Sequence, residues 1–487
     1  MKLRNILLGW IMIVVLSVAA APVRGQTSEK AEAIDNLMRT YHTYGLFNGS
    51  VLVAEKGRVI LKKGYGLANM EWNIPNTADT RHRLGSITKQ FTSMAIMQLV
   101  EQGKIKLDAP LSAYLPEYRK DVGDKVTIHH LLTHTSGIPS YTGIPGFFAD
   151  KARDPYTPDA FIAKFCSGDL EFEPGSQFKY NNSGYFILGA VIEHVTGKTY
   201  AAVLRKNIFE PLGMDASGYD LHTPIITKRA AGYQQGLNGY VNAPYLDMSI
   251  PYAAGSLYST VEDLYTWDQA LYTDTLLSAE MKARMFTPCM KGYGYGWGIG
   301  TRKIGDRQVK TIGHGGGIHG FNTLITRYVD DRHLVVLLNN TGGTKLGEMT
   351  AQIANLLYGE PVVPPKKPAA RILMKAYSEN GVTGGEAEFA RLLADGGYDL
   401  SENMLNNLGY AFMARKKWNE AVSIFLKNTE LFADSPNTWD SLAEGYLKKG
   451  EEEKAIRYYK KTLEMNPDNP GAVEHLKKLG VTWKKKP

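Results

Sequence analysis

Cysteine is nearly absent from this chain, whose 487 residues include only Cys166 and Cys289. Two cysteines cannot build a disulfide framework, and neither of them has the spacing of a metal ligand. In an oxidising compartment they could pair with each other, and two unpaired, buried cysteines are the equal alternative. We therefore expect no structural metal and no cofactor.

A strong charge of one sign is also missing. The chain has 56 Lys and Arg against 49 Asp and Glu, a formal net charge of +7. Three of these bases and none of the acids lie in residues 1–25, so the balance elsewhere is only mildly positive. Such a balance argues against a nucleic-acid partner.

A long apolar run occurs at the N-terminus, from Ile6 to Ala21. Basic residues precede it and small residues follow it, which predicts a secretory signal peptide over residues 1–25. The alternative is an uncleaved membrane anchor, because the run is close to the lower length limit for spanning a bilayer. In both cases we expect the body of the protein to be exported, periplasmic or secreted, with no stable membrane insertion after cleavage.

The length of the chain suits two or three domains. Residues 26–358 mix helical periodicity with short alternating stretches, which predicts an α+β body. Prolines then gather in residues 359–370, a composition typical of a stiff linker. We expect residues 371–487 to form a separate helical domain.

The sequence beyond the linker repeats with a period of 34 residues, so that Leu408 corresponds to Leu442. The two units, 402–435 and 436–469, predict an all-α repeat domain, and the second fits the tetratricopeptide pattern well. Residues 371–400 resemble a degenerate earlier unit. Repeats of this kind either present a groove to a protein partner or pack as a structural appendage, and the sequence leaves both alternatives open.

Ser86 stands at the start of a strongly apolar segment. Between Phe91 and Val100 the apolar positions go almost all the way round a helical wheel, which predicts a helix buried in a core. Lys89 lies one turn after Ser86 on the same helical face, so that ammonium and hydroxyl can interact. The helix N-terminus adds free N–H groups and a positive dipole end, which suit the binding of an oxyanion.

The Ser-x-x-Lys spacing alone does not identify a site, because it occurs twice. The second copy, Ser176 to Lys179, follows a Pro-Gly turn and has the pattern of an extended chain. Directly after it, Tyr180 and Asn182 lie in a loop before an apolar helix, where side chains can reach into a cleft. The alternative is that Tyr180 packs and that Asn182 caps the helix.

Histidine and glycine mark two further stretches. His130 and His134 stand four residues apart, but without a glutamate between them or a nearby third ligand, which favours a structural role over a metal site. Glycines flank His314 on both sides and leave a bare backbone on which a substrate could lie as an added strand; the alternative is a flexible loop. Residues 293–297, where aromatic residues alternate with glycine, predict a strand that another segment approaches closely.

Three motifs in this order, Ser86-x-x-Lys89, Tyr180-x-Asn182 and His314-Gly315-Gly316, resemble those of the penicillin-recognising serine hydrolases. The branch in question contains class C β-lactamases, D-aminopeptidases and esterases. The resemblance covers residues 26–358. It implies a β-lactamase-like fold, with an antiparallel sheet flanked by helices and a helical subdomain, that precedes the tetratricopeptide-type repeats.

The resemblance also implies roles for these residues. Ser86 would be the nucleophile that forms an acyl-enzyme, and Tyr180 would be the general base, held deprotonated by Lys89 or sharing its proton. Asn182 would bind the substrate amide or the lysine, and the N–H groups of Ser86 and Gly317 would form the oxyanion hole. One cation about 4 Å away supplies the roughly 4 kcal/mol that brings a tyrosine pKa from about 10 to about 7.

The third motif departs from the family pattern, because class C β-lactamases carry Lys-Thr-Gly where this chain has His314, Gly315 and Gly316. Histidine is mostly uncharged near neutral pH, and glycine lacks the hydroxyl that helps to hold a substrate carboxylate. The departure favours small-molecule or peptide substrates without a carboxylate there: esters, amides, or peptides cut at an N-terminal D-residue. The alternatives are a class C-like β-lactamase, a D-alanyl-D-alanine carboxypeptidase, or a non-catalytic binding or sensing protein that works through its repeats.

Overall fold

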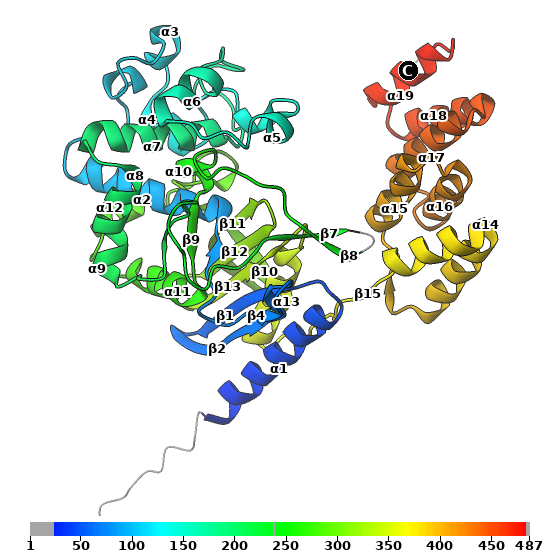
Figure 1. Cartoon of the computed structure of the whole chain (residues 1–487), viewed down its shortest axis with the longest axis horizontal. Helices are drawn as coiled ribbons and strands as arrows, with labels where there is room; N and C mark the ends of the chain where they lie inside the picture. Colours follow the sequence, from blue (N-terminus) through cyan, green and yellow to red (C-terminus); the bar gives the residue numbers. More distant parts are fainter. Residues whose placement is uncertain (1–23, 237–238, 484–487) are drawn as a thin grey trace, which may run out of the picture.

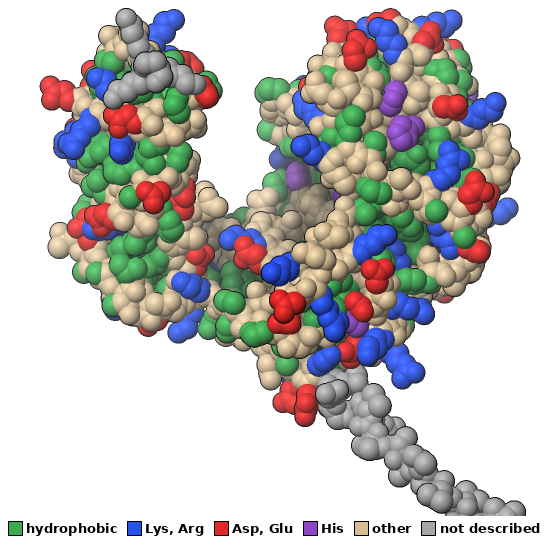
Figure 2. Space-filling model, turned by 180° about the vertical axis from the view of Figure 1, so that it is seen from behind, with side chains coloured by type: hydrophobic (Ala, Val, Ile, Leu, Met, Phe, Trp, Pro, Cys, Tyr) green, Lys and Arg blue, Asp and Glu red, His purple; other side chains and the backbone are tan. Residues whose placement is uncertain are grey.

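The computed structural model describes residues 24–236 and 239–483, which form an α+β lobe and an all-α lobe (Figure 1). Seen from behind, the two lobes stand apart across a deep hollow (Figure 2). The predicted signal segment, residues 1–25, falls outside the described residues except for its last two, which begin helix α1 (Arg24–Thr43). Within the described part of the chain, every helix is too short or too polar to span a membrane.

A six-stranded antiparallel sheet is the centre of the α+β lobe. Its strand order is β10-β11-β12-β13-β1-β2, so the first two strands of the chain add to the edge of a meander formed 230 residues later. The strands are β1 (Gly49–Glu55), β2 (Arg58–Tyr65), β10 (Gly298–Ile304), β11 (Arg307–Ile318), β12 (Phe321–Tyr328) and β13 (His333–Asn339).

Both faces of this sheet are buried. Alternate residues of β13 contribute to two different hydrophobic clusters, as the two-residue period of a strand requires. Val335 and Leu337 pack with α1 and α13 (Leu346–Tyr358) on one face. The opposite face packs against the larger cluster, which also holds the helices around the predicted site.

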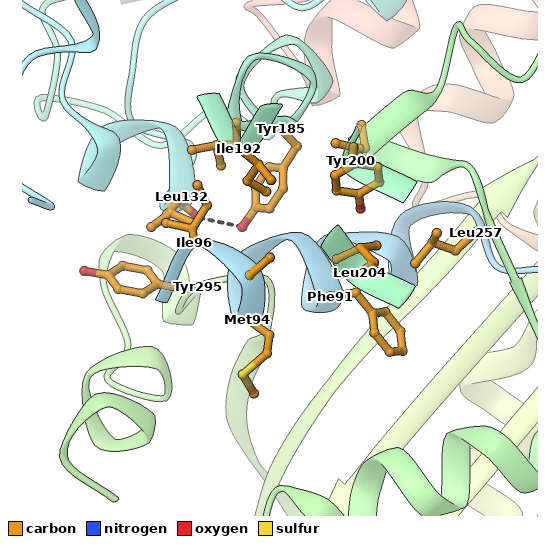
Figure 3. Packing of buried hydrophobic residues seen from close by; sticks show 14 of the residues in the cluster. Phe91, Met94, Ile96, Leu132, Tyr185, Ile192, Tyr200, Leu204, Leu257 and Tyr295 are labelled. Atoms are coloured by element: carbon orange, nitrogen blue, oxygen red, sulfur yellow. Dashed lines mark hydrogen bonds between the residues drawn. The ribbon is translucent and has the colours of Figure 1, made fainter. Parts of the chain in front are cut away.

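Helix α2 (Thr88–Glu101) runs through that larger cluster, and its first twelve residues are all buried. Side chains from several elements surround it in Figure 3, where the Tyr185 hydroxyl donates to the carbonyl of Leu132 at 2.8 Å. The predicted buried helix is therefore present. It begins two residues after Ser86, because residues 85–87 form a 3₁₀ turn that leads into it.

The remaining elements of this lobe surround the sheet and α2. The helices are α3 (Lys120–Gly123), α4 (Ile128–Leu132), α5 (Phe147–Asp150), α6 (Pro158–Phe165), α7 (Asn182–Thr196), α8 (Tyr200–Leu204), α9 (Glu210–Leu212), α10 (Tyr252–Gly255), α11 (Val261–Ala270) and α12 (Ala279–Met285). Two small sheets have the orders β5-β9-β6 and β14-β7-β8, and a β3-β4 ladder lies apart from them. Their strands are β3 (Leu67–Asn69), β4 (Ile74–Pro75), β5 (His82–Arg83), β6 (Gly218–Tyr219), β7 (Tyr233–Gly236), β8 (Gly239–Asn242), β9 (Leu257–Ser259) and β14 (Thr341–Gly342).

The all-α lobe has a hydrophobic core of its own, formed by side chains from Ala369 to Leu476. Helix pairs occupy both predicted repeat units, and a short parallel ladder between β15 (Lys367–Pro368) and β16 (Tyr398–Asp399) ties the linker to this lobe. The helices are α14 (Ala370–Asp395), which kinks at Gly381, α15 (Glu402–Ala414), α16 (Trp418–Leu431), α17 (Pro436–Lys449), α18 (Glu452–Met465) and α19 (Pro470–Lys478).

Candidate active site

Lys89 links the parts of the predicted site. Its Nζ donates to Ser86 Oγ at 3.0 Å, to Asn182 Oδ1 at 2.8 Å and to the carbonyl oxygen of Ala254 at 2.8 Å. These acceptors use all three N–H bonds of an ammonium group. Lys89 is completely buried, and this burial lowers its pKa well below the usual value for lysine. Burial thus favours the neutral amine, which can accept a proton from Ser86, whereas the three acceptors favour the ammonium form.

Asn182 is the first residue of α7, and it does not cap the helix. The cap is Asn181, whose side-chain oxygen accepts from the N–H of Gly184 at 2.8 Å. The alternative that Asn182 caps the helix is therefore wrong by one position. Asn182 is free to turn its oxygen toward Lys89, while its Nδ2 donates to Thr142 Oγ1 at 3.2 Å.

Tyr180 lies over the lysine, with Lys89 Nζ 5.0 Å from the centre of its ring. Although 38% of its surface is exposed, burial of the phenol raises the pKa of Tyr180, and the interaction with Ser86 only partly opposes this. The pKa of Tyr180 is thus shifted upward, whereas the sequence predicted a lowered pKa for a tyrosine beside a fixed cation. Tyr180 is thus a neutral phenol in the free protein and can donate a proton.

His134 also lies at this site, and the sequence did not predict its place there. Its ring centre is 4.3 Å from that of Tyr180, and its Nδ1 accepts from the N–H of Asn181 at 3.0 Å. His134 is buried and has a positive φ of 59°, a backbone conformation that a pattern of residue types does not predict. Within the described ranges, no group of three or more His, Cys, Asp or Glu residues is placed to hold a metal ion.

Strand β11 borders the site with an unpaired edge. Its neighbour β10 begins at Gly298, which pairs with Gly313, so among the described strands none pairs with β11 beyond Gly313 on that side. Residues of a strand direct their backbone N–H and C=O alternately to the two sides. Gly315 and Gly317 therefore direct theirs to the same side as Gly313, toward the open edge. This edge is continuous strand, so the alternative of a flexible loop is wrong.

Gly317 N–H comes close to the turn that carries Ser86. A Cβ atom added to Gly85, which has a φ of +55°, would lie 2.9 Å from the nitrogen of Gly317. Ser86 follows Gly85 in the 3₁₀ turn, where the first N–H groups have no partner within the turn. The backbone of Gly317 therefore lies against the turn that carries Ser86, and the oxyanion hole formed by their N–H groups stays a prediction.

Gly316 has a different environment from Gly315. A Cβ atom on Gly316 would lie 1.9 Å from the carbonyl oxygen of Leu84, an oxygen that also accepts from Thr323 Oγ1 at 2.6 Å. A Cβ atom on Gly315 would meet only ordinary contacts at 3.7 Å or more. Gly316 is therefore required for the packing of β11 against the chain that leads to Ser86.

His314 lies beside this site without a positive charge. Its Nδ1–H donates to the carbonyl of Gly315 at 2.6 Å, which leaves Nε2 to accept from the Tyr293 hydroxyl at 3.0 Å. Burial and the nearby charge of Lys89 lower the pKa of His314 to about 4. The prediction that the motif His314-Gly315-Gly316 carries no charge agrees with this environment.

The expected strand over residues 293–297 is wrong, because β10 begins only at Gly298. Gly296 has a φ of +79°, which interrupts an extended chain. The close approach predicted for this stretch is present: a Cβ atom on Gly296 would lie 2.6 Å from the carbonyl oxygen of Lys89.

A cavity of about 430 Å³ opens in front of Ser86. None of the described residues that line it is a Lys, Arg, Asp or Glu, so its walls carry no permanent charge. Tyr180 and His314 lie outside this lining. The polar lining includes Ser86, Asn182 and Gly317, and the apolar lining includes Tyr141, Phe148, Leu246, Ile250, Ile318 and Phe321.

Comparison with known proteins points to one family. A model described as Beta-lactamase matches residues 31–358, and a tetratricopeptide repeat model matches residues 436–469. Penicillin-binding protein 4* of Bacillus subtilis (strain 168) is 30% identical over 365 residues, covering 70% of this chain and 79% of that protein. Teichoic acid D-alanine hydrolase of Staphylococcus aureus is 28% identical over 317 residues, covering 64% and 74%.

Two further similarities concern an esterase and an amidase. Esterase EstB of Burkholderia gladioli is 36% identical over 188 residues, which cover 36% of this chain and 47% of that protein. The crystal structure of D-amino acid amidase from Ochrobactrum anthropi SV3, complexed with L-phenylalanine amide, has a TM-score of 0.59 and 25% identity. It covers 68% of this chain and 99% of that chain.

Proposed function

Because this chain belongs to the beta-lactamase family and is a serine hydrolase with a β-lactamase-like fold, we propose that it hydrolyses an ester, an amide or a D-amino-acid-containing peptide through an acyl-enzyme on Ser86. The family and the fold, with tetratricopeptide-type helices after the hydrolase domain, are confirmed as predicted. The observation that carries the proposal is the 3.0 Å contact between Lys89 Nζ and Ser86 Oγ beside an uncharged cavity.

In the acylation step that we propose, Lys89 starts as the neutral amine and Tyr180 as the neutral phenol, the forms that burial favours. Neutral Lys89 takes the proton of Ser86 as Oγ attacks the carbonyl carbon of the substrate. The N–H groups of Ser86 and Gly317 stabilise the oxyanion that forms. Tyr180 donates its proton to the leaving oxygen or nitrogen as the bond to the acyl group breaks. Lys89 then returns its proton to Tyr180, so the acyl-enzyme and the free alcohol or amine account for all atoms.

In deacylation, water replaces Ser86 as the attacking nucleophile and Ser86 becomes the leaving group. Water attacks the acyl carbon and gives its proton to Lys89, and Ser86 leaves as the hydroxyl form when that proton reaches its Oγ. Asn182 keeps Lys89 aligned in both steps, because its oxygen accepts from Nζ and its amide nitrogen is anchored on Thr142. The net reaction consumes one water and releases the acid.

The environment of the cavity supports a neutral substrate near the reacting carbonyl. A class C-like β-lactamase or a D-alanyl-D-alanine carboxypeptidase would need a fixed cation at the third motif, where His314 is uncharged. The names of the relatives, which include an esterase, a D-alanine hydrolase and a D-amino acid amidase, agree with the ester and D-amino-acid alternatives. We therefore place these substrate classes before β-lactams.

A substrate panel tests the proposal. Purified protein should hydrolyse short-chain 4-nitrophenyl esters and D-amino acid amides, with weak or no turnover of penicillins and cephalosporins. A mechanism-based serine probe should label the wild type but not Ser86→Ala. Efficient cephalosporin hydrolysis would overturn the substrate preference, and absence of labelling at any pH would favour the alternative of a binding or sensing protein.

The repeats and the export of the protein complete the proposal. We infer that the all-α lobe recruits a protein partner, since its core is separate from the clusters of the hydrolase lobe. Removal of residues 370–487 should then leave ester hydrolysis intact, whereas loss of soluble protein would show that the repeats complete the hydrolase. Fractionation of expressing cells should find the protein in the periplasm or the medium; retention in the cytoplasm would contradict export.

A further inference from the structure

A second, smaller pocket of about 270 Å³ adjoins the active-site cavity. Leu246, His319 and Phe321 line both spaces and so form the border between them. The side chain of His319 is held by Nδ1, which donates to the carbonyl of Pro244 at 3.2 Å. A ligand bound at Ser86 that extends past this border reaches the second pocket.

The two pockets differ in charge. Arg83 and Arg229 line the smaller one, together with His222 and His319, and none of its described lining residues is acidic. Asp220 has a completely buried side chain and accepts from Arg83 Nε at 2.7 Å and from Arg229 Nη1 at 2.5 Å. The cluster of Arg83, Arg229 and Asp220 therefore keeps one positive charge. A further carboxylate, Asp247, lies beside the pocket and accepts from the hydroxyl of the lining residue Tyr245 at 3.3 Å.

This positive charge is accessible from the pocket. The side chains of Arg83 and Arg229 are 14% and 31% exposed, whereas that of Asp220 is 0% exposed. Each arginine uses one nitrogen for Asp220, and a guanidinium has five N–H bonds, so further donors remain for a ligand. Burial lowers the pKa of His319, and the charge of Arg83 lowers it further, which shows that this charge acts on the border between the pockets.

The arginine pocket is also within reach of the nucleophile along the chain. Arg83 is the last residue of β5, three positions before Ser86. Three residues of extended chain span at most roughly 11 Å. The backbones of Arg83 and Ser86 are therefore close, and the shared lining residues connect the space in front of Ser86 with the pocket that Arg83 lines.

We propose that Arg83 and Arg229 form a subsite for an oxyanion, a carboxylate or a phosphate, at the far end of the acyl group of the substrate. The inference rests on the proposed function and narrows its substrate class. The acyl group would be uncharged and partly apolar near the scissile carbonyl, where the cavity lining is uncharged, and anionic at its end. Guanidinium groups suit this ligand because they bind planar oxyanions through two parallel hydrogen bonds.

A series of 4-nitrophenyl half-esters of linear dicarboxylic acids, from succinate to suberate, tests the subsite. Each half-ester is paired with its methyl-capped diester, and the quantity measured is the ratio of their kcat/KM values. In the wild type this ratio should favour the half-ester by about tenfold at one chain length, the effect of one charged hydrogen bond. The preference should decrease as salt is added, because salt screens the arginine charge.

Variants of Arg229 distinguish a loss of anion recognition from a loss of activity toward all esters. Arg229→Gln should lower the ratio to near one, and Arg229→Lys, which keeps the charge, should retain part of it. Arg81→Gln is the matched control: Arg81 lies 5.8 Å from the Tyr258 ring, donates to Thr227, and is not part of the pocket lining. This control should keep the wild-type ratio. The salt dependence of the wild type remains decisive if Arg229→Gln does not fold.

Direct binding gives a readout that does not depend on catalysis. Adipate should bind to Ser86→Ala in a calorimetric titration, and the additional Arg229→Gln change should abolish this binding while Arg81→Gln should not. A parallel series of esters that end in a phosphonate distinguishes phosphate from carboxylate recognition. Hydrolysis of the capped esters without preference for any half-ester or phosphonate, together with no binding of adipate, overturns the subsite and leaves the proposed function intact. Adipate binding without hydrolysis of any ester supports the subsite and contradicts the proposed function.

Discussion

The chain contains the Ser-x-x-Lys spacing twice, and the two copies have different environments. At Ser86 and Lys89 the serine lies in a 3₁₀ turn at a helix start, and the lysine is completely buried, 3.0 Å from the serine hydroxyl. At Ser176 and Lys179 the chain is irregular, and the side chains point to different partners. Ser176 Oγ donates to the carbonyl of Glu173 at 2.6 Å, whereas Lys179 pairs with a glutamate on the surface.

The difference lies in what surrounds the lysine. Lys179 has a side chain that is 56% exposed and forms a surface ion pair with Glu171. Lys89 lacks this exposure, and its pKa is lowered well below the usual value by burial alone. The same four-residue spacing therefore gives a buried lysine beside a serine hydroxyl in one place and a surface ion pair in the other.

Removal of each serine should produce the largest contrast between the copies. Ser86→Ala should lower ester hydrolysis by roughly 10³-fold or more, since the nucleophile is lost while the oxyanion hole and cavity remain. Ser176→Ala should retain wild-type activity, because its hydroxyl contacts only a local carbonyl. Steady-state kinetics with a 4-nitrophenyl ester measure both. Equal losses in the two variants would contradict the assignment of the nucleophile.

Removal of each lysine should give a smaller but still clear contrast. Lys89→Ala should lower kcat by about 10²- to 10⁴-fold, the range for a lost general base, and Lys89→Arg should not restore it because arginine stays charged. Lys179→Ala breaks a surface ion pair with Glu171, worth at most about 1 kcal/mol, and should leave kcat unchanged. Rescue of activity by Lys89→Arg would show that a cation, and not a base, is what the site requires.

The parts of this site that could be predicted are those that short spacings determine. Helical geometry places Lys89 over Ser86, and the position of Asn182 at a helix start brings it near a cleft. The carbonyl of Ala254 could not be predicted, because it lies 165 residues from Lys89 in the sequence and reaches it only through the fold. The order of the motifs was sufficient for the fold class, since that order is what the family shares.

Two features of the site could not be read from the sequence, for different physical reasons. The cap of α7 is Asn181 and not Asn182, because either amide satisfies the residue preference and only the backbone angles select one of them. The raised pKa of Tyr180 was also not expected, because the sequence shows which groups are near but not how completely they exclude water. Burial, which depends on the whole fold, decides both the protonation of Lys89 and that of Tyr180.

Substitutions at two adjacent glycines of β11 test whether this strand supports the turn that carries Ser86. Gly316→Ala should lower the free energy of unfolding by about 2 to 3 kcal/mol, because its Cβ atom would overlap the carbonyl of Leu84 two residues before Ser86. Gly315→Ala should change it by less than about 0.5 kcal/mol, since its Cβ atom meets only ordinary contacts. Urea unfolding compares the two. Equal stability of both variants would show that β11 does not hold the Ser86 turn in place.

The last contrast concerns His314, whose pKa, like that of Lys89, is lowered by burial. Its folded-state pKa of about 4 lies below the usual 6.5, so the folded protein binds fewer protons than the unfolded chain between these two values. Stability is therefore complete above pH 6.5 and decreases as the pH falls toward 4, by at most about 3 kcal/mol from this residue. His314→Gln removes the titration and should lose less stability than the wild type between pH 7 and pH 4.5, as urea unfolding at both values can measure. An unchanged pH dependence in His314→Gln would contradict a lowered pKa of His314 in the folded protein.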